Sequence, residues 1–247
     1  MPAWLYLLVP LIAFLYASVG FGGATGYLAV MSLFGIPPQI MASTALVLNI
    51  LVAGISFISF RRAGHLRSNL LLPFLVTSVP AAFLGGFLKI GDGLYGVLLY
   101  LVLTFVAVRL LFFSKHQDES LPLRPVPPVW ARLIGLGIGL LSGMVGIGGG
   151  IFLSPVILFA CWGSARQASA VASAFIVLNS LSGLLGRISG GTFMLDAFGL
   201  SLLPLGVLGA LAGSYLGAQK LSGLSLRRAL GAVISVIVTN FWWVVLK

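Results

Sequence analysis

Long apolar runs fill almost the whole of this sequence, and they restrict its fold more than any other feature. A helix of about 20 apolar residues spans the hydrocarbon core of a bilayer. Of the 247 residues, 60% are hydrophobic and only 7% are charged, so a soluble domain could not cover its apolar surface. We therefore predict an all-α polytopic membrane protein and exclude a soluble enzyme, a nucleic-acid-binding module and a disordered chain. About eight hydrophobic segments are expected, at Trp4–Phe34, Ile40–Phe60, Leu70–Leu88, Leu94–Phe113, Leu133–Trp162, Ala168–Leu185, Phe198–Leu216 and Leu230–Leu246.

The charged residues are mostly basic. Lys and Arg number 14 against 4 Asp and Glu, which gives a formal net charge of +10. They lie almost entirely between the apolar runs, as in loops that set membrane topology, and a further role in attracting anions is left open. The single cysteine, Cys161, excludes an intramolecular disulfide. Because no Lys or Arg precedes the first run, we expect a retained helix rather than a cleaved signal.

The two halves of the chain resemble each other on either side of a polar, proline-containing stretch at residues 114–128. Each half has a glycine cluster inside its longest apolar run, then an Ala-Ser segment with an asparagine, a proline and a Leu-Gly pair. These landmarks are Gly20–Ala24 and Gly146–Gly150, Ala42–Asn49 and Ala172–Asn179, Pro73 and Pro204, and Leu84-Gly85 and Leu216-Gly217. We predict two homologous repeats, at 1–113 and 129–247, joined by a linker at 114–128. Such repeats are typical of transporters, with the substrate site between them.

The first run in each half is too long for one membrane helix. Trp4–Phe34 has 31 residues, so an unbroken helix would be about 46 Å long against a hydrocarbon core of about 30 Å. We expect a break at its glycine cluster, so that each repeat has a broken first segment followed by three transmembrane helices. If the broken runs cross the membrane, the 14 Lys and Arg divide about nine to five; if they are re-entrant hairpins, about eleven to three. The positive-inside rule favours hairpins, which make the repeats inverted and leave both termini outside the cytoplasm; the crossing arrangement remains the alternative.

The glycine clusters are candidates for an anion-binding site. The first turn of a helix carries free N–H groups and a partial positive charge, and glycine lets a ligand approach those groups closely. Two such helix starts meeting inside the membrane would bind an anion, whereas close helix packing through small residues is the alternative. The substrate-binding candidates from these clusters are Gly22, Gly23, Ala24, Thr25, Gly148, Gly149 and Gly150.

Polar side chains on the following helices form a second group of candidates. An asparagine inside an apolar segment is costly unless it forms hydrogen bonds. Asn49 and Asn179 each follow a serine by six residues, about 600° around a helix, so each serine and its asparagine lie on different faces. We expect each asparagine to face the glycine break, with hydrogen bonding between helices as an equal alternative to ligand binding. The substrate-binding candidates here are Ser43, Thr44, Asn49, Ser173 and Asn179.

Basic residues at the ends of two apolar runs have two interpretations each. Arg61, Arg62 and His65 follow the second run directly, where they anchor the chain at the cytoplasmic surface or collect anions. His65 is also the titratable candidate for proton coupling, although a proton could instead travel on the substrate. Arg187 lies inside an apolar stretch, where it either extends to the membrane interface or places positive charge near the site.

The few acidic residues lie in loops or at segment ends, at Asp92, Asp118, Glu119 and Asp196. Cation transporters and proton pumps usually carry a carboxylate inside the membrane, which this pattern lacks. The sequence shows no His, Cys or acidic cluster suited to a metal, so we expect no metal, no other cofactor and no enzymatic activity. The expected partners are a small anionic substrate and the lipid bilayer, without nucleic acid; homo-oligomerisation is left open.

The segments GFGGATG at residues 20–26 and GMVGIGGGIF at residues 143–152 resemble the sulfite exporter TauE/SafE family of membrane permeases, as does the stretch Arg61–His65. The resemblance covers essentially the whole chain. It implies a secondary transporter of sulfite, thiosulfate or organosulfonates such as sulfoacetate, working by alternating access in a bacterial inner membrane. It also implies that the substrate path is lined by Gly22, Gly23 and Gly148–Gly150; Ala24 departs from the glycine of the second half. A small-anion channel and a transporter of another anion class are the alternatives.

Overall fold

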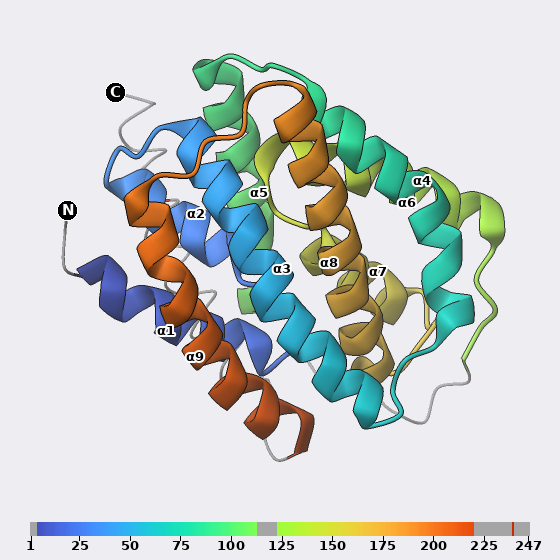
Figure 1. Cartoon of the computed structure of the whole chain (residues 1–247). Coiled ribbons are helices and arrows are strands. Elements are labelled where there is room, and N and C mark those ends of the chain that lie inside the picture. Colours follow the sequence, from blue (N-terminus) through green and yellow to red (C-terminus); the bar gives the residue numbers. More distant parts are fainter. Residues whose placement is uncertain (1–3, 113–122, 220–238, 240–247) are drawn as a thin grey trace.

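The computed structural model describes residues 4–112, 123–219 and 239 of the chain, and within these residues all regular structure is α-helical (Figure 1). This confirms the helical class expected from the apolar runs. Apart from residue 239, the expected last segment, 230–246, lies outside the described residues, as does most of the linker at 114–128. The helices are α1 (Trp4–Ala17), α2 (Ala24–Leu33), α3 (Pro38–Arg62), α4 (Ser68–Phe87), α5 (Asp92–Phe112), α6 (Pro128–Val145), α7 (Gly150–Phe159), α8 (Ala165–Ser189) and α9 (Ala197–Gln219).

Five of the described helices, α3, α4, α6, α8 and α9, are long and apolar enough to cross a membrane. Many of their large apolar side chains point outward, including Leu72, Val76 and Leu208. Exposure of this kind is unfavourable in water and favourable in lipid. The described part of the chain is therefore that of an integral membrane protein.

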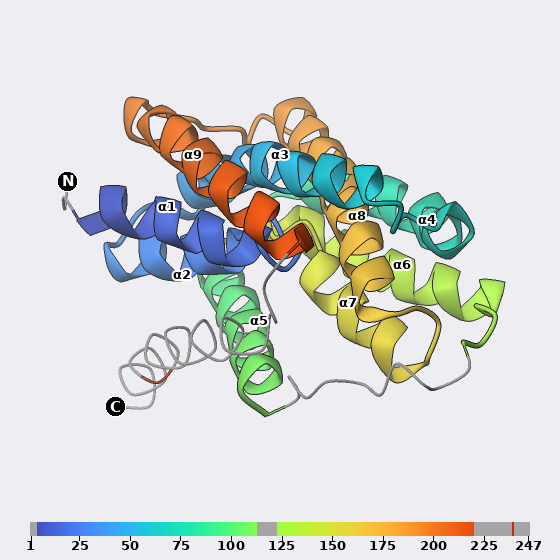
Figure 2. The ribbon, with the colours of Figure 1, turned by 90° about the horizontal axis from the view of Figure 1, so that it is seen from below.

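The first long apolar run is broken at its glycine cluster, as the sequence predicts. Helix α1 ends at Ala17 and α2 begins at Ala24. The hydroxyl of Tyr16 lies 2.7 Å from Oγ1 of Thr25, and Gly26 packs against Ile12, one turn farther back in α1. Helix α2 therefore returns alongside α1, and Figure 2 shows the two helices side by side. The run folds as a helical hairpin.

The second long run is broken in the same way. Helix α6 ends at Val145 and α7 begins at Gly150, after the intervening glycine cluster. The backbone N–H of Arg124, before α6, donates to the carbonyl of Cys161, after α7, at 2.8 Å. The chain therefore turns back at this break too, and α7 runs back along the direction from which α6 came.

The packing of the helices is reciprocal between the two halves. Helix α4 packs against α6 and α8, whereas α9 packs against α1 and α3; α3 and α8 pack together between these two groups (Figure 1). Small residues allow the close approach, since a methyl group at Gly143 would collide with the backbone carbonyl of Ala82, and one at Gly213 with that of Phe14. These contacts hold the two hairpins on opposite sides of the α3–α8 pair.

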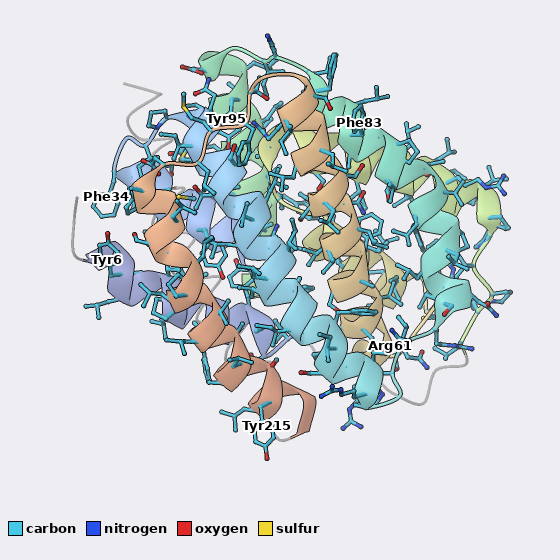
Figure 3. The ribbon with its side chains drawn as sticks, in the orientation of Figure 1. Tyr6, Phe34, Arg61, Phe83, Tyr95 and Tyr215 are labelled. Atoms are coloured by element: carbon cyan, nitrogen blue, oxygen red, sulfur yellow. The ribbon has the colours of Figure 1, made fainter. Side chains whose placement is uncertain are left out.

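Most of the described basic side chains lie at one end of the molecule, which we call the basic end; Lys89 and the buried Arg187 are exceptions. Helix α3 ends there and α4 begins there; Gly163 packs on Leu70, and the backbone N–H of Arg124 donates to the carbonyl of Cys161. Figure 3 shows Arg61 at this end and Phe34 and Tyr95 toward the other. Lys89 follows the opposite end of α4. The arginines of the basic end are Arg61, Arg62, Arg67, Arg124, Arg132 and Arg166.

Candidate functional site

Helices α2 and α7 each begin after a glycine in the left-handed conformation. Gly23 has φ 89° and Gly149 has φ 80°, a backbone geometry that L side chains rarely adopt. Neither residue provides a side chain to cap the helix that follows. The first N–H groups of both ten-residue helices therefore need acceptors from elsewhere in the fold or from a ligand.

Asn49 of α3 supplies an acceptor for one of these helix starts and binds the other break as well. Its Oδ1 accepts a hydrogen bond from the backbone N–H of Ala24, at 3.2 Å. Its Nδ2 donates to the carbonyl of Ile147, at 3.0 Å. The side chain is fully buried. The structure places Asn49 at the glycine breaks, where its hydrogen bonds link helices.

The position equivalent to Asn49 in the second half is Ile176, not Asn179. Helices α3 and α8 both have 25 residues, and counting from their starts places Asn49 and Ile176 at the same position. Both side chains lie against Gly22 and Gly148. Nδ2 of Asn179 instead donates to the carbonyl of Phe175 within α8. The pairing of the two asparagines expected from the sequence is therefore wrong, because the Ser-Asn spacing does not mark the register of α3 and α8.

A small cavity lies where the two breaks meet. Its volume is about 10 Å³, which is room for about one water molecule. Both helix starts contribute to its wall, and no lining residue carries a charge. The lining residues are Tyr16, Phe21, Gly22, Gly23, Ala24, Thr25, Ile147, Ile151 and Ile176. Tyr16 is not predicted from the sequence, because it enters the site only where α2 folds back along α1.

Two buried hydroxyl groups beside the breaks have no hydrogen-bond partner among the described residues. The hydroxyl of Tyr27 lies 2.7 Å from where a methyl group on Gly23 would sit, and Oγ of Ser180 lies 2.8 Å from the same position on Gly148. Both side chains are fully buried. Because buried polar groups are rarely left unsatisfied, these hydroxyls indicate that the breaks bind a polar ligand or water.

Other predicted binding residues lie away from the cavity lining. Oγ of Ser43 accepts a hydrogen bond from the backbone N–H of Met194, near the start of α9. Thr44 faces Gly199 at the same end, and Oγ of Ser173 donates to the carbonyl of Ala170 in its own helix. Gly149 and Gly150 face side chains of α6 and α8. The structure therefore brings together Gly22–Thr25, Asn49 and Gly148, but not the three hydroxyl residues.

Arg187 is buried, with only 6% of its surface exposed. Its Nη2 donates to the carbonyl of Met144 at 2.6 Å and to that of Gly143 at 3.4 Å. The hydroxyl of Tyr95 donates to the next carbonyl, that of Val145, at 3.0 Å. A cation at the C-terminal end of a helix is favourable both for the free carbonyls and for the helix dipole. The expectation that Arg187 extends to the membrane interface is therefore wrong: it caps α6 directly before the second break.

The other basic candidates lie at the basic end. Arg61 and Arg62 are exposed in the last turn of α3, and Arg61 lies over the ring of Phe57. His65 is in the following loop, where partial burial and the positive charge of Arg166 lower its pKa. The rise of α3 separates Arg62 from Asn49 by about 20 Å. These residues therefore do not touch the cavity.

The chemistry of the breaks suits the oxygen atoms of an anion better than a metal. No cluster of three or more His, Cys, Asp or Glu occurs in the part of the chain that the structure describes. The groups at the breaks are helix N–H donors, hydroxyls and one amide. N–H groups at helix starts bind anionic oxygens without a basic side chain.

Known proteins resemble this chain over nearly its whole length. The family model described as Sulfite exporter TauE/SafE matches residues 5–241. The chain is 33% identical over 234 residues to "Probable membrane transporter protein y4hK" of Sinorhizobium fredii, and 25% identical over 252 residues to "Probable membrane transporter protein MJ0441" of Methanocaldococcus jannaschii; each match covers 94% of both chains. No solved structure matches it. This chain therefore belongs to the sulfite exporter TauE/SafE family and is a membrane transporter.

Proposed function

We propose that this protein is a secondary transporter of small sulfur-containing anions: sulfite, thiosulfate or organosulfonates such as sulfoacetate. The observation that carries the proposal is that the first turns of α2 and α7, through Ala24 and Ile151, line one cavity with no charged lining residue. The family name supports the sulfur-anion class. The substrate oxygens accept hydrogen bonds from the first N–H groups of α2 and α7, and Oγ1 of Thr25 adds a hydroxyl donor from the cavity wall.

Transport proceeds by alternating access between two inverted repeats. Support comes from the reciprocal packing, in which α4 lies on α6 and α8 while α9 lies on α1 and α3. The matched lengths of α2 and α7, and of α3 and α8, agree with a duplication of the chain into 1–113 and 129–247. In inverted repeats, rocking of one half against the other exposes a central site first to one side and then to the other.

The basic end faces the cytoplasm, and both termini lie on the non-cytoplasmic side of a bacterial inner membrane. The described arginines at that end support this orientation, since loops rich in Lys and Arg remain in the cytoplasm. The hairpin form of the broken runs supports re-entrant segments that do not cross the membrane. Helix α1 then starts at the end opposite the basic end, where Tyr6 lies beside Phe198 near the start of α9.

The experiment that tests this function is flux into liposomes containing the purified protein. We expect saturable uptake of radiolabelled sulfite, thiosulfate or sulfoacetate, accelerated by the same unlabelled anion on the opposite side. A channel would show no such acceleration. Selective flux of phosphate or chloride instead would show a transporter of another anion class.

A matched pair of glycine variants tests whether the transport flux depends on the glycine breaks. Gly148→Ala strains a left-handed backbone and places a methyl group 2.8 Å from the side chains of Asn49 and Ser180, so we expect at least a tenfold loss of flux. Gly35→Ala strains a left-handed backbone of φ 64° with no atom within 4 Å of the new methyl group. Equal loss in both variants would contradict the placement of the site at the breaks.

A further inference from the structure

We propose that Asn49 is a displaceable internal ligand: its amide oxygen occupies the position that a substrate oxygen takes at the start of α2, and substrate binds by replacing it. This inference rests on the proposed function and deepens it. In this role Asn49 competes with the substrate for the start of α2 and links the two breaks while no substrate is bound; we call this link the latch. It does not bind the substrate directly.

The first observation is the hydrogen bond that Oδ1 of Asn49 accepts from the backbone N–H of Ala24. The N–H of Ala24 is the first of α2 and points out of the helix, where an anion would bind. Gly23 has no side chain to cap it. A neutral amide oxygen therefore satisfies a group that favours negative charge. A charged oxygen makes a stronger hydrogen bond than a neutral one, so a substrate anion can displace the amide.

The second observation is the position of the small cavity. The cavity is lined by Ala24, by both neighbouring glycines and by Thr25, so it adjoins the hydrogen bond that Asn49 makes. The hydroxyl of Tyr27 lies beside Gly23, fully buried and without a partner among the described residues. An anion that replaced the amide oxygen would find this unused hydroxyl close to the start of α2.

The third observation is that the same amide holds the other break. Nδ2 of Asn49 donates to the carbonyl of Ile147, between α6 and α7. One planar amide cannot keep this bond unchanged if its oxygen is turned away from Ala24. Substrate binding at α2 therefore loosens a link between the two hairpins. This couples occupancy of the site to the relative movement of the halves.

The fourth observation is that the second half has no equivalent latch. Ile176 lies at the corresponding place in α8 and packs on Gly22, Gly148 and Gly150. Its apolar side chain cannot accept a hydrogen bond from the start of α7. The two helix starts are therefore inequivalent: that of α2 is occupied from within, and that of α7 is left for the substrate.

Equilibrium binding to the detergent-purified full chain tests this role, with thiosulfate, sulfoacetate and sulfite as probes in titration calorimetry. Asn49→Ala removes the competitor, so we expect the Kd of a probe that binds the wild type to fall at least fivefold. Asn49→Asp fixes a carboxylate of the same shape at the start of α2, so we expect that Kd to rise at least tenfold. Ser182→Ala removes another buried hydrogen bond between helices, from Oγ of Ser182 to the carbonyl of Val79, and should change the Kd by less than twofold.

The outcomes separate this inference from the proposed function. An Asn49→Ala Kd that is unchanged or weaker would overturn the displacement role while leaving sulfur-anion binding in place. If Asn49→Ala does not yield a monodisperse protein, an unchanged or tighter Kd for Asn49→Asp overturns it instead. Failure of the wild type to bind any of the three anions, thiosulfate, sulfoacetate and sulfite, contradicts the proposed function itself.

Discussion

Asn49 and Ile176 occupy the same position in α3 and α8, and both pack against Gly22 and Gly148. One of the pair forms hydrogen bonds to both glycine breaks, and the other forms none through its side chain. The two hairpins therefore have matching form, but the side chains that contact their glycine breaks differ in hydrogen bonding. A single amide creates this difference at the centre of the molecule.

Close packing of α4 on α8 predicts opposite effects for two glycine substitutions. A methyl group at Gly86 would collide with the carbonyl of Gly183, so Gly86→Ala should lower the free energy of unfolding by about 1–3 kcal/mol. Gly54, inside α3, has no atom within 4 Å of a new methyl group, so Gly54→Ala should raise it by about 0.5–1 kcal/mol. Thermal unfolding in detergent measures both; similar stability of the two variants would contradict the packing.

The cap of α6 by Arg187 predicts a loss of stability from a mutation that leaves the cavity lining unchanged. Arg187→Met leaves the buried carbonyls of Met144 and Gly143 without their donor, which should cost about 1–3 kcal/mol. Arg62→Gln, at an exposed helix end, should change stability by less than about 0.5 kcal/mol. Thermal melting of the two variants under the same conditions checks this. A Tm for Arg187→Met within error of the wild type would refute the cap.

The lowered pKa of His65 predicts a stability loss in mild acid. Burial and the charge of Arg166 disfavour the imidazolium in the folded protein, whereas the unfolded chain titrates near the ordinary value of 6.5. As the pH falls below that value, the unfolded state binds the proton first and stability decreases. His65→Gln should remove this part of the pH dependence of the Tm, and Arg166→Gln should reduce it. A wild-type pH profile retained in His65→Gln would show that another group is responsible.

The orientation of the basic end predicts the labelling of Cys161. This thiol is half-buried, and its carbonyl accepts a hydrogen bond from Arg124 at the basic end. With that end in the cytoplasm, a membrane-impermeant maleimide should label Cys161 in permeabilised cells but not in intact ones. Labelling of intact cells from outside would place the basic end on the other side of the membrane.

Sequence reasoning located the helix breaks because two independent signals coincide there. Each broken run is too long for one crossing of the membrane, and each has its glycines in the middle. In the structure, Gly23 and Gly149 of these clusters adopt the left-handed conformation. Helices α2 and α7 begin at the next residue in each case. A glycine cluster weakens a helix and readily adopts left-handed backbone conformations, so the break can be predicted without knowledge of tertiary contacts.

The rest of the site depends on tertiary contacts, which sequence patterns alone do not predict. The register of α3 against α8 depends on where each helix begins, at Pro38 and Ala165, rather than on the spacing of serine and asparagine. The role of Arg187 depends on the end of α6 lying beside α8. Local propensity and hydropathy describe segments one at a time, so they cannot predict which segment ends meet.

The most direct test of an anion site at the breaks is a thermal-shift measurement on the detergent-purified protein with sulfite, thiosulfate, sulfoacetate, sulfate, phosphate and chloride at equal ionic strength. A ligand at 100 times its Kd adds about 2.7 kcal/mol of stability. We predict selective stabilisation of the wild type by at least one sulfur anion, and its loss in Gly148→Ala but not in Gly35→Ala. No stabilisation of the wild type by any sulfur anion, or equal stabilisation of both glycine variants, would contradict the account.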